Sequence, residues 1–210
     1  MNPSSTDVLV LHAVRVTGFA DVPTLATRFC LDPAGTDELL GDFEAYGWVQ
    51  RSAFADLGGW SLTQAGRVEN ERRLAAELAS TGRGAEVRAV HREFLPLNAR
   101  LRQACTDWQL RPAAGSKLTP NDHADPAWDT AVLESLATVD DALGPLVHRL
   151  SSVLARFEGY DVRFAHALDR ARAGDGTWID GSDVDSCHRV WFELHEDLVA
   201  TLGIDRGHPV

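Results

Sequence analysis

Residues 32–67 read DPAGTDELLGDFEAYGWVQRSAFADLGGWSLTQAGR, and the fold of the amino-terminal part of the chain is predicted from this stretch. Asp32 followed by Pro33 is the order typical of a helix N-cap and the first helical residue. Apolar residues then recur at helical spacing, at Leu39, Leu40, Phe43 and Tyr46. Gly47 is placed to end the helix in a left-handed conformation. The stretch therefore predicts a short amphipathic helix that begins at Pro33.

Two short strands and a long helix are expected after this helix. The strands are predicted around 48–52 and 59–62, joined by a turn through Asp56, Gly58 and Gly59. Thr63 is expected to begin the long helix. Two further short helices are predicted at the start of the chain, the first ending near Gly18 and the second capped by Asp21. The predicted order is three helices, a hairpin and a fourth helix.

This order is that of a winged helix-turn-helix domain, in which the hairpin is the wing. Residues 7–75, roughly one third of the chain, resemble that superfamily, and in particular bacterial regulators of the MarR and PadR kind. The matching positions lie in the helix-turn segment, at the end of the third helix and in the returning strand of the wing: Leu25-Ala26, Phe29–Leu31, Leu40, Phe43-Glu44, Gly47–Val49, Gly59–Thr63 and Gly66-Arg67. The resemblance implies a transcriptional regulator that binds double-stranded DNA.

The candidate DNA contacts are side chains and backbone N–H groups in the second helix, at the start of the third helix and around the wing. They are Thr24, Thr27, Arg28, Gly35, Thr36, Arg51, Ser52 and Arg67. Hydroxyl, guanidinium and helix N-terminal N–H groups all donate to phosphate oxygens. Such contacts position a protein on a duplex without specifying the base sequence.

The third helix departs from the usual pattern of these regulators. It carries none of the Arg, Lys, Asn and Gln side chains that make the common base contacts. Its expected exposed positions include Asp37, Glu38 and Asp42, whose charges repel phosphates. An alternative interpretation is therefore a protein-interaction adaptor that keeps the winged-helix fold and binds a partner protein instead of DNA.

The remainder of the chain is expected to be helical. Apolar residues recur at alternating three and four spacing over 87–108 and over 132–157, where Pro145 is expected to kink one continuous helix. Two more helices are expected over 162–172 and 183–202. The segment between the helices expected over 87–108 and 132–157, from Leu110 to Pro126, is expected to form a long connection.

The overall prediction is a mainly α fold with two domains. Residues 1–80 form a winged helix-turn-helix domain with a small β-wing, and residues 81–210 form an antiparallel helical bundle. A winged helix needs far fewer residues than this chain has, so the bundle is expected to dimerise, to sense an effector, or both. The expected assembly is a homodimer, because such regulators read two half-sites.

The candidate ligand-binding residues are histidines, carboxylates and one tryptophan in the last two helices: His166, Asp169, Asp185, His188, Trp191 and His195. One interpretation is a pocket for a metal ion or an anionic small molecule held between helices. The other is that the histidines are hydrogen-bonded packing residues and that Trp191 belongs to the core or to a dimer interface. The spacing matches no zinc or iron motif, so no set of metal ligands is predicted.

Composition excludes several classes of function. The chain of 210 residues carries a formal net charge of -11, which repels nucleic acid unless a local basic surface overcomes it. The three cysteines include no CxxC pair, which fits a reducing cytoplasm. No apolar run spans a bilayer and residues 1–7 are polar, so we expect a cytoplasmic protein without a membrane partner. Since hydrolase and nucleotide-binding motifs are missing, we predict no enzyme, no catalytic residues and no cofactor.

Overall fold

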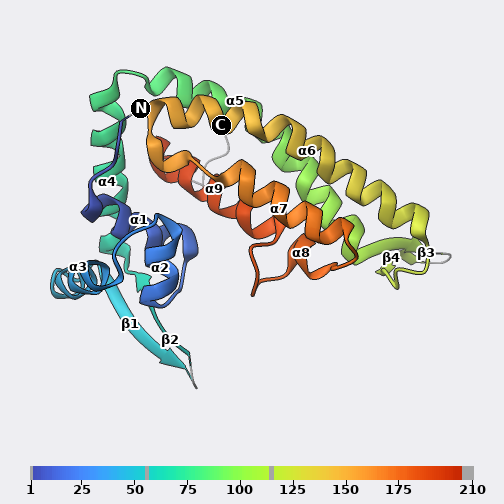
Figure 1. Cartoon of the computed structure of the whole chain (residues 1–210), viewed down its shortest axis with the longest axis horizontal. Coiled ribbons are helices and arrows are strands. Elements are labelled where there is room, and N and C mark those ends of the chain that lie inside the picture. The colour runs from blue at the N-terminus through green and yellow to red at the C-terminus, as the bar shows by residue number, and fades with distance from the viewer. Residues whose placement is uncertain (1, 55–56, 114–115, 205–210) are drawn as a thin grey trace. The chain divides into compact units, whose positions relative to one another are not determined.

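The computed structural model describes residues 2–54, 57–113 and 116–204. The chain is mainly helical, as expected, and its described part contains two separate two-stranded antiparallel sheets (Figure 1). Within these residues, no helix has both the length and the apolar character that crossing a membrane requires.

The chain divides into two compact units. The first comprises Met1–Val87, Ser151–Arg156 and Glu193–Val210, and the second comprises Arg88–Leu150 and Phe157–Phe192. The expected boundary near residue 80 lies close to the end of the first segment. The first unit also includes two segments of the region expected to form the bundle, where Arg156 pairs with Asp197 and Ala200 packs with Val8 and Leu74.

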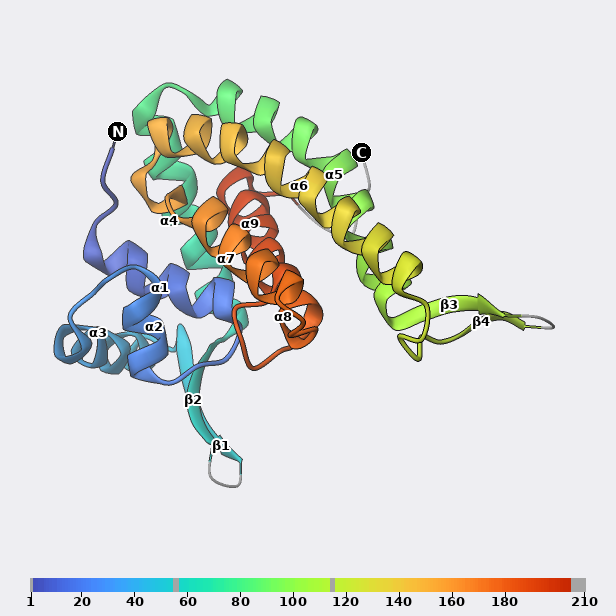
Figure 2. The same ribbon diagram turned by 45° about the vertical axis from the view of Figure 1, so that its right-hand side comes forward.

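The first unit has the element order expected from the sequence. Its amino-terminal part consists of α1 (Thr6–Thr17), α2 (Val22–Arg28), α3 (Pro33–Ala45), β1 (Val49–Phe54), β2 (Leu57–Leu62) and α4 (Gln64–Thr81). The two strands pair antiparallel with Val49 opposite Leu62, and the hairpin extends away from the three helices in both views (Figures 1 and 2). Gly58 and Gly59 lie in β2 rather than in the predicted turn, and Asp56 lies outside the described residues.

Three helices of this unit begin at caps that the sequence predicted. Asp21 accepts a hydrogen bond from the Thr24 N–H at 3.0 Å, and Asp32 accepts one from the Gly35 N–H at 2.8 Å. The Thr63 hydroxyl accepts one from the N–H of Gly66 at 3.0 Å. Each cap satisfies an N–H group that the first turn of the helix leaves without a partner.

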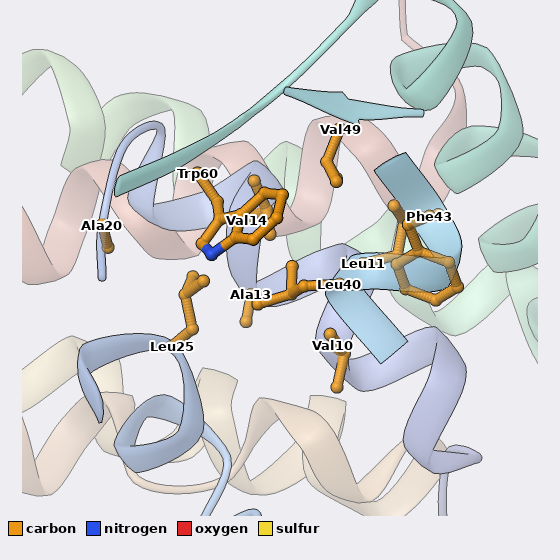
Figure 3. Close-up of a cluster of buried hydrophobic side chains, with 10 residues drawn as sticks. All are labelled: Val10, Leu11, Ala13, Val14, Ala20, Leu25, Leu40, Phe43, Val49 and Trp60. Atoms are coloured by element: carbon orange, nitrogen blue, oxygen red, sulfur yellow. The ribbon is translucent and has the colours of Figure 1, made fainter. Parts of the chain in front are cut away.

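The apolar faces of these helices and of the hairpin form one core. Figure 3 shows its buried residues: Val10, Leu11, Ala13, Val14, Ala20, Leu25, Leu40, Phe43, Val49 and Trp60. The prediction that Tyr46 belongs to the buried apolar stripe of α3 is wrong, because this residue lies at the end of the helix beyond the core. Tyr46 is 66% exposed and packs against Trp48. A Cβ atom at Gly66 would lie 1.8 Å from the Trp48 carbonyl oxygen, so the close approach of α4 to that carbonyl requires glycine.

The remaining elements are mainly long helices. They are α5 (Gly84–Gln109), β3 (Leu110–Ala113), β4 (Ser116–Pro120), α6 (Pro126–Val153), a 3₁₀ turn (Ala155–Phe157), α7 (Tyr160–Arg172), α8 (Thr177–Asp180) and α9 (Cys187–Leu202). Pro145 lies inside α6, so one continuous helix is confirmed there, although it ends before Phe157. The last helix begins at Cys187 rather than near residue 183.

The predicted long connection after α5 is wrong, because its residues form a hairpin. Leu110 pairs with Pro120 and Arg111 with Thr119, and the hairpin extends from the adjoining ends of α5 and α6 in both views (Figures 1 and 2). In a two-stranded sheet both strands are edges, so prolines in them need not interrupt a ladder.

Candidate functional site

The candidate DNA contacts fall into two groups according to their exposure. Five of them are exposed, on α2, β1 and the first turn of α4: Thr24, Thr27, Arg51, Ser52 and Arg67. We call these residues the exposed candidate set. Arg51 lies opposite Trp60 in the hairpin, with its guanidinium carbon 5.8 Å from the centre of the indole ring. Cross-strand partners point to the same face of a sheet, so Arg51 reaches solvent beside the buried Trp60.

The other three candidates are engaged within the first unit. The Arg28 side chain is 7% exposed, and its Nε donates to Glu193 Oε2 at 2.9 Å. Thr36 is buried and its hydroxyl donates to the Asp32 carbonyl oxygen at 2.8 Å. The Gly35 N–H already donates to the carboxylate of Asp32. These three groups are therefore bonded within the protein, whereas the sequence-based hypothesis predicted that they contact phosphates.

The outward face of α3 is acidic. Its exposed residues include Asp37, Glu38, Asp42 and Glu44, and the helix contains no basic side chain. Two arginines of α4 do not offset this charge, since Arg72 and Arg73 both bond to Glu69. Hydrogen bonds from Arg72 and then from Arg73 lower the pKa of Glu69 to about 2, which keeps that carboxylate ionised.

Buried carboxylates of α9 engage the arginines of α1 and α2. We call Glu193, Glu196 and Asp197 the α9 carboxylates; all three are buried in the first unit. Arg15 Nε donates to Glu196 Oε1 at 2.5 Å, and Arg28 pairs with Glu193 as described. Two positive charges that a DNA-binding surface would expose are thus neutralised inside the protein.

Asp197 lies at the centre of this arrangement. Its carboxylate is paired with Arg156, and its Oδ1 lies 3.0 Å from His12 Nε2. The same guanidinium donates to Thr201 Oγ1 at 2.8 Å and to Glu77 Oε2 at 3.2 Å. Burial by itself would raise the pKa of Asp197, but the charge of Arg156, the charge and hydrogen bond of His12 and the charge of Arg28 together hold that pKa well below its ordinary value.

Sequence reasoning missed these buried pairs, because their partners lie in different elements of the chain, at least 41 positions apart. Arg15 and Glu196 are separated by 181 positions, and Arg28 and Glu193 by 165. A weak signal was present in α9, where the carboxylates adjoin the buried Leu194 along the apolar seam. Acidic residues beside an apolar seam are either buried against a positively charged partner or exposed at the edge of the buried face. The sequence does not distinguish these two cases.

The candidate ligand-binding residues are held by separate partners. Asp185 accepts two hydrogen bonds from Arg163, at 2.7 and 2.8 Å, and His166 packs edge-on against Trp178 with ring centres 5.1 Å apart. Asp169 is exposed and lies 3.8 Å from Arg172.

The remaining members of that set are Trp191, His188 and His195. Trp191 is buried in the second unit, where it stacks on Phe94 and donates from its indole N–H to Asn98 Oδ1 at 3.0 Å. His188 is exposed, while His195 belongs to the first unit. Across the described ranges, no three His, Cys, Asp or Glu residues are grouped so as to hold a metal ion. Trp191 therefore has the core role that was the alternative interpretation.

Comparisons with protein-family models, with curated proteins and with solved structures find no match to the chain. The function is therefore argued from the charges and contacts of the molecule itself.

Proposed function

We propose that the first unit is a winged helix-turn-helix domain and that the protein is a transcriptional regulator that binds double-stranded DNA through it. In this proposal the β1–β2 hairpin is the wing and the exposed candidate set contacts phosphates. The regulator acts as a cytoplasmic homodimer, and its second unit contributes to dimerisation or to effector sensing. The order of α1 to α4 with the hairpin between α3 and α4 supports the proposed domain.

The observation that carries the proposal is the state of the arginines in the first unit. Six of them have a carboxylate within ion-pair distance: Arg15, Arg28, Arg72, Arg73, Arg83 and Arg156. Arg51 and Arg67 are exposed and have no such partner among the described residues. An arginine that has no carboxylate partner within the protein is available to pair with an external anion. In the proposed complex with DNA, the β1–β2 hairpin and the start of α4 meet the phosphates of the duplex.

A salt series tests this proposal. Anisotropy of a labelled duplex from the region upstream of the gene is compared with that of an unrelated duplex between about 50 and 200 mM salt. Arg51→Ala and Arg67→Ala are each expected to weaken binding and to reduce the slope of log affinity against log salt by about 0.9. Arg72→Ala is the matched control, since that exposed arginine is already paired with Glu69. Equal binding by all three variants, or no binding at the lowest salt, would contradict the proposal.

A second candidate function is the adaptor that binds a protein through α3. The exposed carboxylates of α3 favour it, because a basic protein surface is attracted to them while a duplex is repelled. The triple variant Asp37→Asn, Glu38→Gln and Asp42→Asn separates the two functions. If α3 faces a duplex, neutralisation strengthens DNA binding; if α3 binds a protein, a partner cross-linked to the wild-type protein in cells and identified by mass spectrometry is lost.

A further inference from the structure

A cleft of about 700 Å³ lies within the second unit, and it is separate from the ligand set that the sequence indicated. It is formed by the end of α5, the start of α6 and the segments that flank α8. The residues that carry the argument are Trp108, His123, Asp129, Arg172, Gly176 and Asp180. A cleft of this size accommodates a small organic molecule.

The indole of Trp108 forms a packed wall of the cleft. Its ring centre lies 4.2 Å from that of His123, and a Cβ atom at Gly176 would lie 2.6 Å from Trp108 Cζ2. The backbone of Gly176 therefore contacts the indole directly, and any larger residue there would displace the ring. Trp108 is thus held between two neighbours and offers an aromatic surface of defined position.

His123 is held by a carboxylate and by its own backbone. Its Nδ1 lies 3.1 Å from Asp129 Oδ2, and Asn121 donates to the other oxygen of that carboxylate at 3.0 Å. The residue has a φ of 56°, and its N–H donates to Asn121 Oδ1 at 3.1 Å. Nδ1 is therefore the ring nitrogen that faces the carboxylate.

The charges that line the cleft are mainly negative. The cleft is lined by two carboxylates, those of Asp129 and Asp180, and by one guanidinium, that of Arg172. Arg172 also lies 3.8 Å from Asp169. Gln109 donates to Asp180 Oδ2 at 2.6 Å, which leaves Oδ1 of that carboxylate as an acceptor for another donor. An aromatic ring beside carboxylates is the combination that attracts an organic cation, while it repels an anion.

We propose that this cleft binds a small organic cation, an ammonium or amidinium group carried on an apolar or aromatic body. Trp108 contacts the body of the ligand, and Asp180 accepts hydrogen bonds from its charged head. The proposal concerns the second unit alone, so it holds or fails independently of DNA binding by the first unit.

Three probes of matched size and different charge test the proposal: benzamidine, benzamide and benzoate. Each is titrated into the ¹⁵N-labelled full chain while the indole N–H signals of the six tryptophans are followed. Benzamidine is expected to shift the Trp108 signal in a saturable way at millimolar concentration, and to bind at least about tenfold more tightly than the other two. Equal binding of the three probes, or no saturable shift with benzamidine up to about 10 mM, overturns the proposal.

Charge variants of opposite sign locate the site. Asp180→Asn is expected to weaken benzamidine binding by about tenfold, whereas Arg172→Gln is expected to strengthen it. Asp141→Asn is the matched control, because this exposed residue of α6 lies about 18 Å along the helix from Asp129. Unchanged signals of the other tryptophans check that each variant is folded. Unchanged affinity in both charge variants places the probe elsewhere and overturns the proposal.

Discussion

Removal of the buried charge of Asp197 is the sharpest test of how the first unit is held together. Asp197 and Arg156 both have fully buried side chains, and Asp197 is in addition 3.0 Å from His12. The variant Asp197→Asn keeps the size of the side chain and removes its charge. It leaves the Arg156 guanidinium beside Glu77, whose Oε2 lies 3.2 Å from Arg156 Nε.

The expected cost follows from this geometry. Removing one member of a buried ion pair typically costs 3–5 kcal/mol, because the other charge stays buried without compensation. Glu77 remains close to Arg156, so we expect the lower end of that range, about 3 kcal/mol. Since a domain of this size has a free energy of unfolding of roughly 5–15 kcal/mol, the loss is large but leaves a folded protein.

Urea unfolding followed by circular dichroism measures this loss. Asp169→Asn is the matched control, because Asp169 is exposed and its arginine partner is 3.8 Å away; little change is expected from it. The double variant Asp197→Asn with Arg156→Met is expected to lose less than the sum of the two single variants, since it removes both buried charges. A loss below about 1 kcal/mol for Asp197→Asn would contradict the expected cost, because it would approach the roughly 0.5 kcal/mol within which surface substitutions usually fall.

The same pair predicts a pH dependence. The pKa of Asp197 in the folded protein is lowered from the ordinary value of 3.8. A carboxyl group with a lowered pKa stabilises the folded state fully above its unfolded pKa, and this stabilisation is lost as pH falls through the folded pKa. The difference between wild type and Asp197→Asn is therefore expected to be constant from neutral pH down to about pH 5 and to shrink only below the ordinary pKa. A difference that disappears between pH 7 and 5 would contradict this.

Three further predictions concern other parts of the chain. Gly66→Ala is expected to prevent normal packing of the first unit, because the new methyl group meets the Trp48 carbonyl; a melting temperature equal to that of the wild type would contradict it. Burial raises the pKa of the Cys105 and Cys187 thiols to about 12, so at pH 8 a thiol-specific disulfide reagent is expected to modify the exposed Cys30 first, and rapid reaction of all three thiols in the folded protein would be inconsistent with their burial. Light scattering coupled to size exclusion is expected to give twice the chain mass of 22.9 kDa at micromolar concentration, and a strict monomer would remove the homodimer from the proposed function.

Local chemistry explains where prediction from the sequence succeeded. Asp21, Asp32 and Thr63 were expected to cap helices, and each accepts a hydrogen bond from an N–H three residues later. Gly47 was expected to end α3 in the left-handed region, and its φ is 72°. Such features depend on residues within one helical turn, so the sequence contains all the interacting groups.

Prediction failed where pairing or packing with a distant partner decides the outcome. The β3–β4 hairpin contains Pro112 and Pro120 and has no clear alternation of polar and apolar residues, so its strands resembled a loop. Tyr46 continues the helical spacing of the apolar residues of α3 but is exposed. Helical spacing alone does not show how far along the helix the core extends. The contacts of the candidate ligand residues likewise depend on tertiary packing, as in the pairs Asp185 with Arg163 and Trp191 with Phe94.

The helix starts and ends, the first hairpin and the apolar positions that form the core follow from local sequence features. Which charged groups are available depends instead on the tertiary structure. Arg28 and Arg51 look alike in the sequence, yet Arg28 is buried against Glu193 while Arg51 is exposed on the hairpin. The physical reason is that a buried charge requires an opposite charge nearby, and here that partner comes from a helix 165 residues further along the chain.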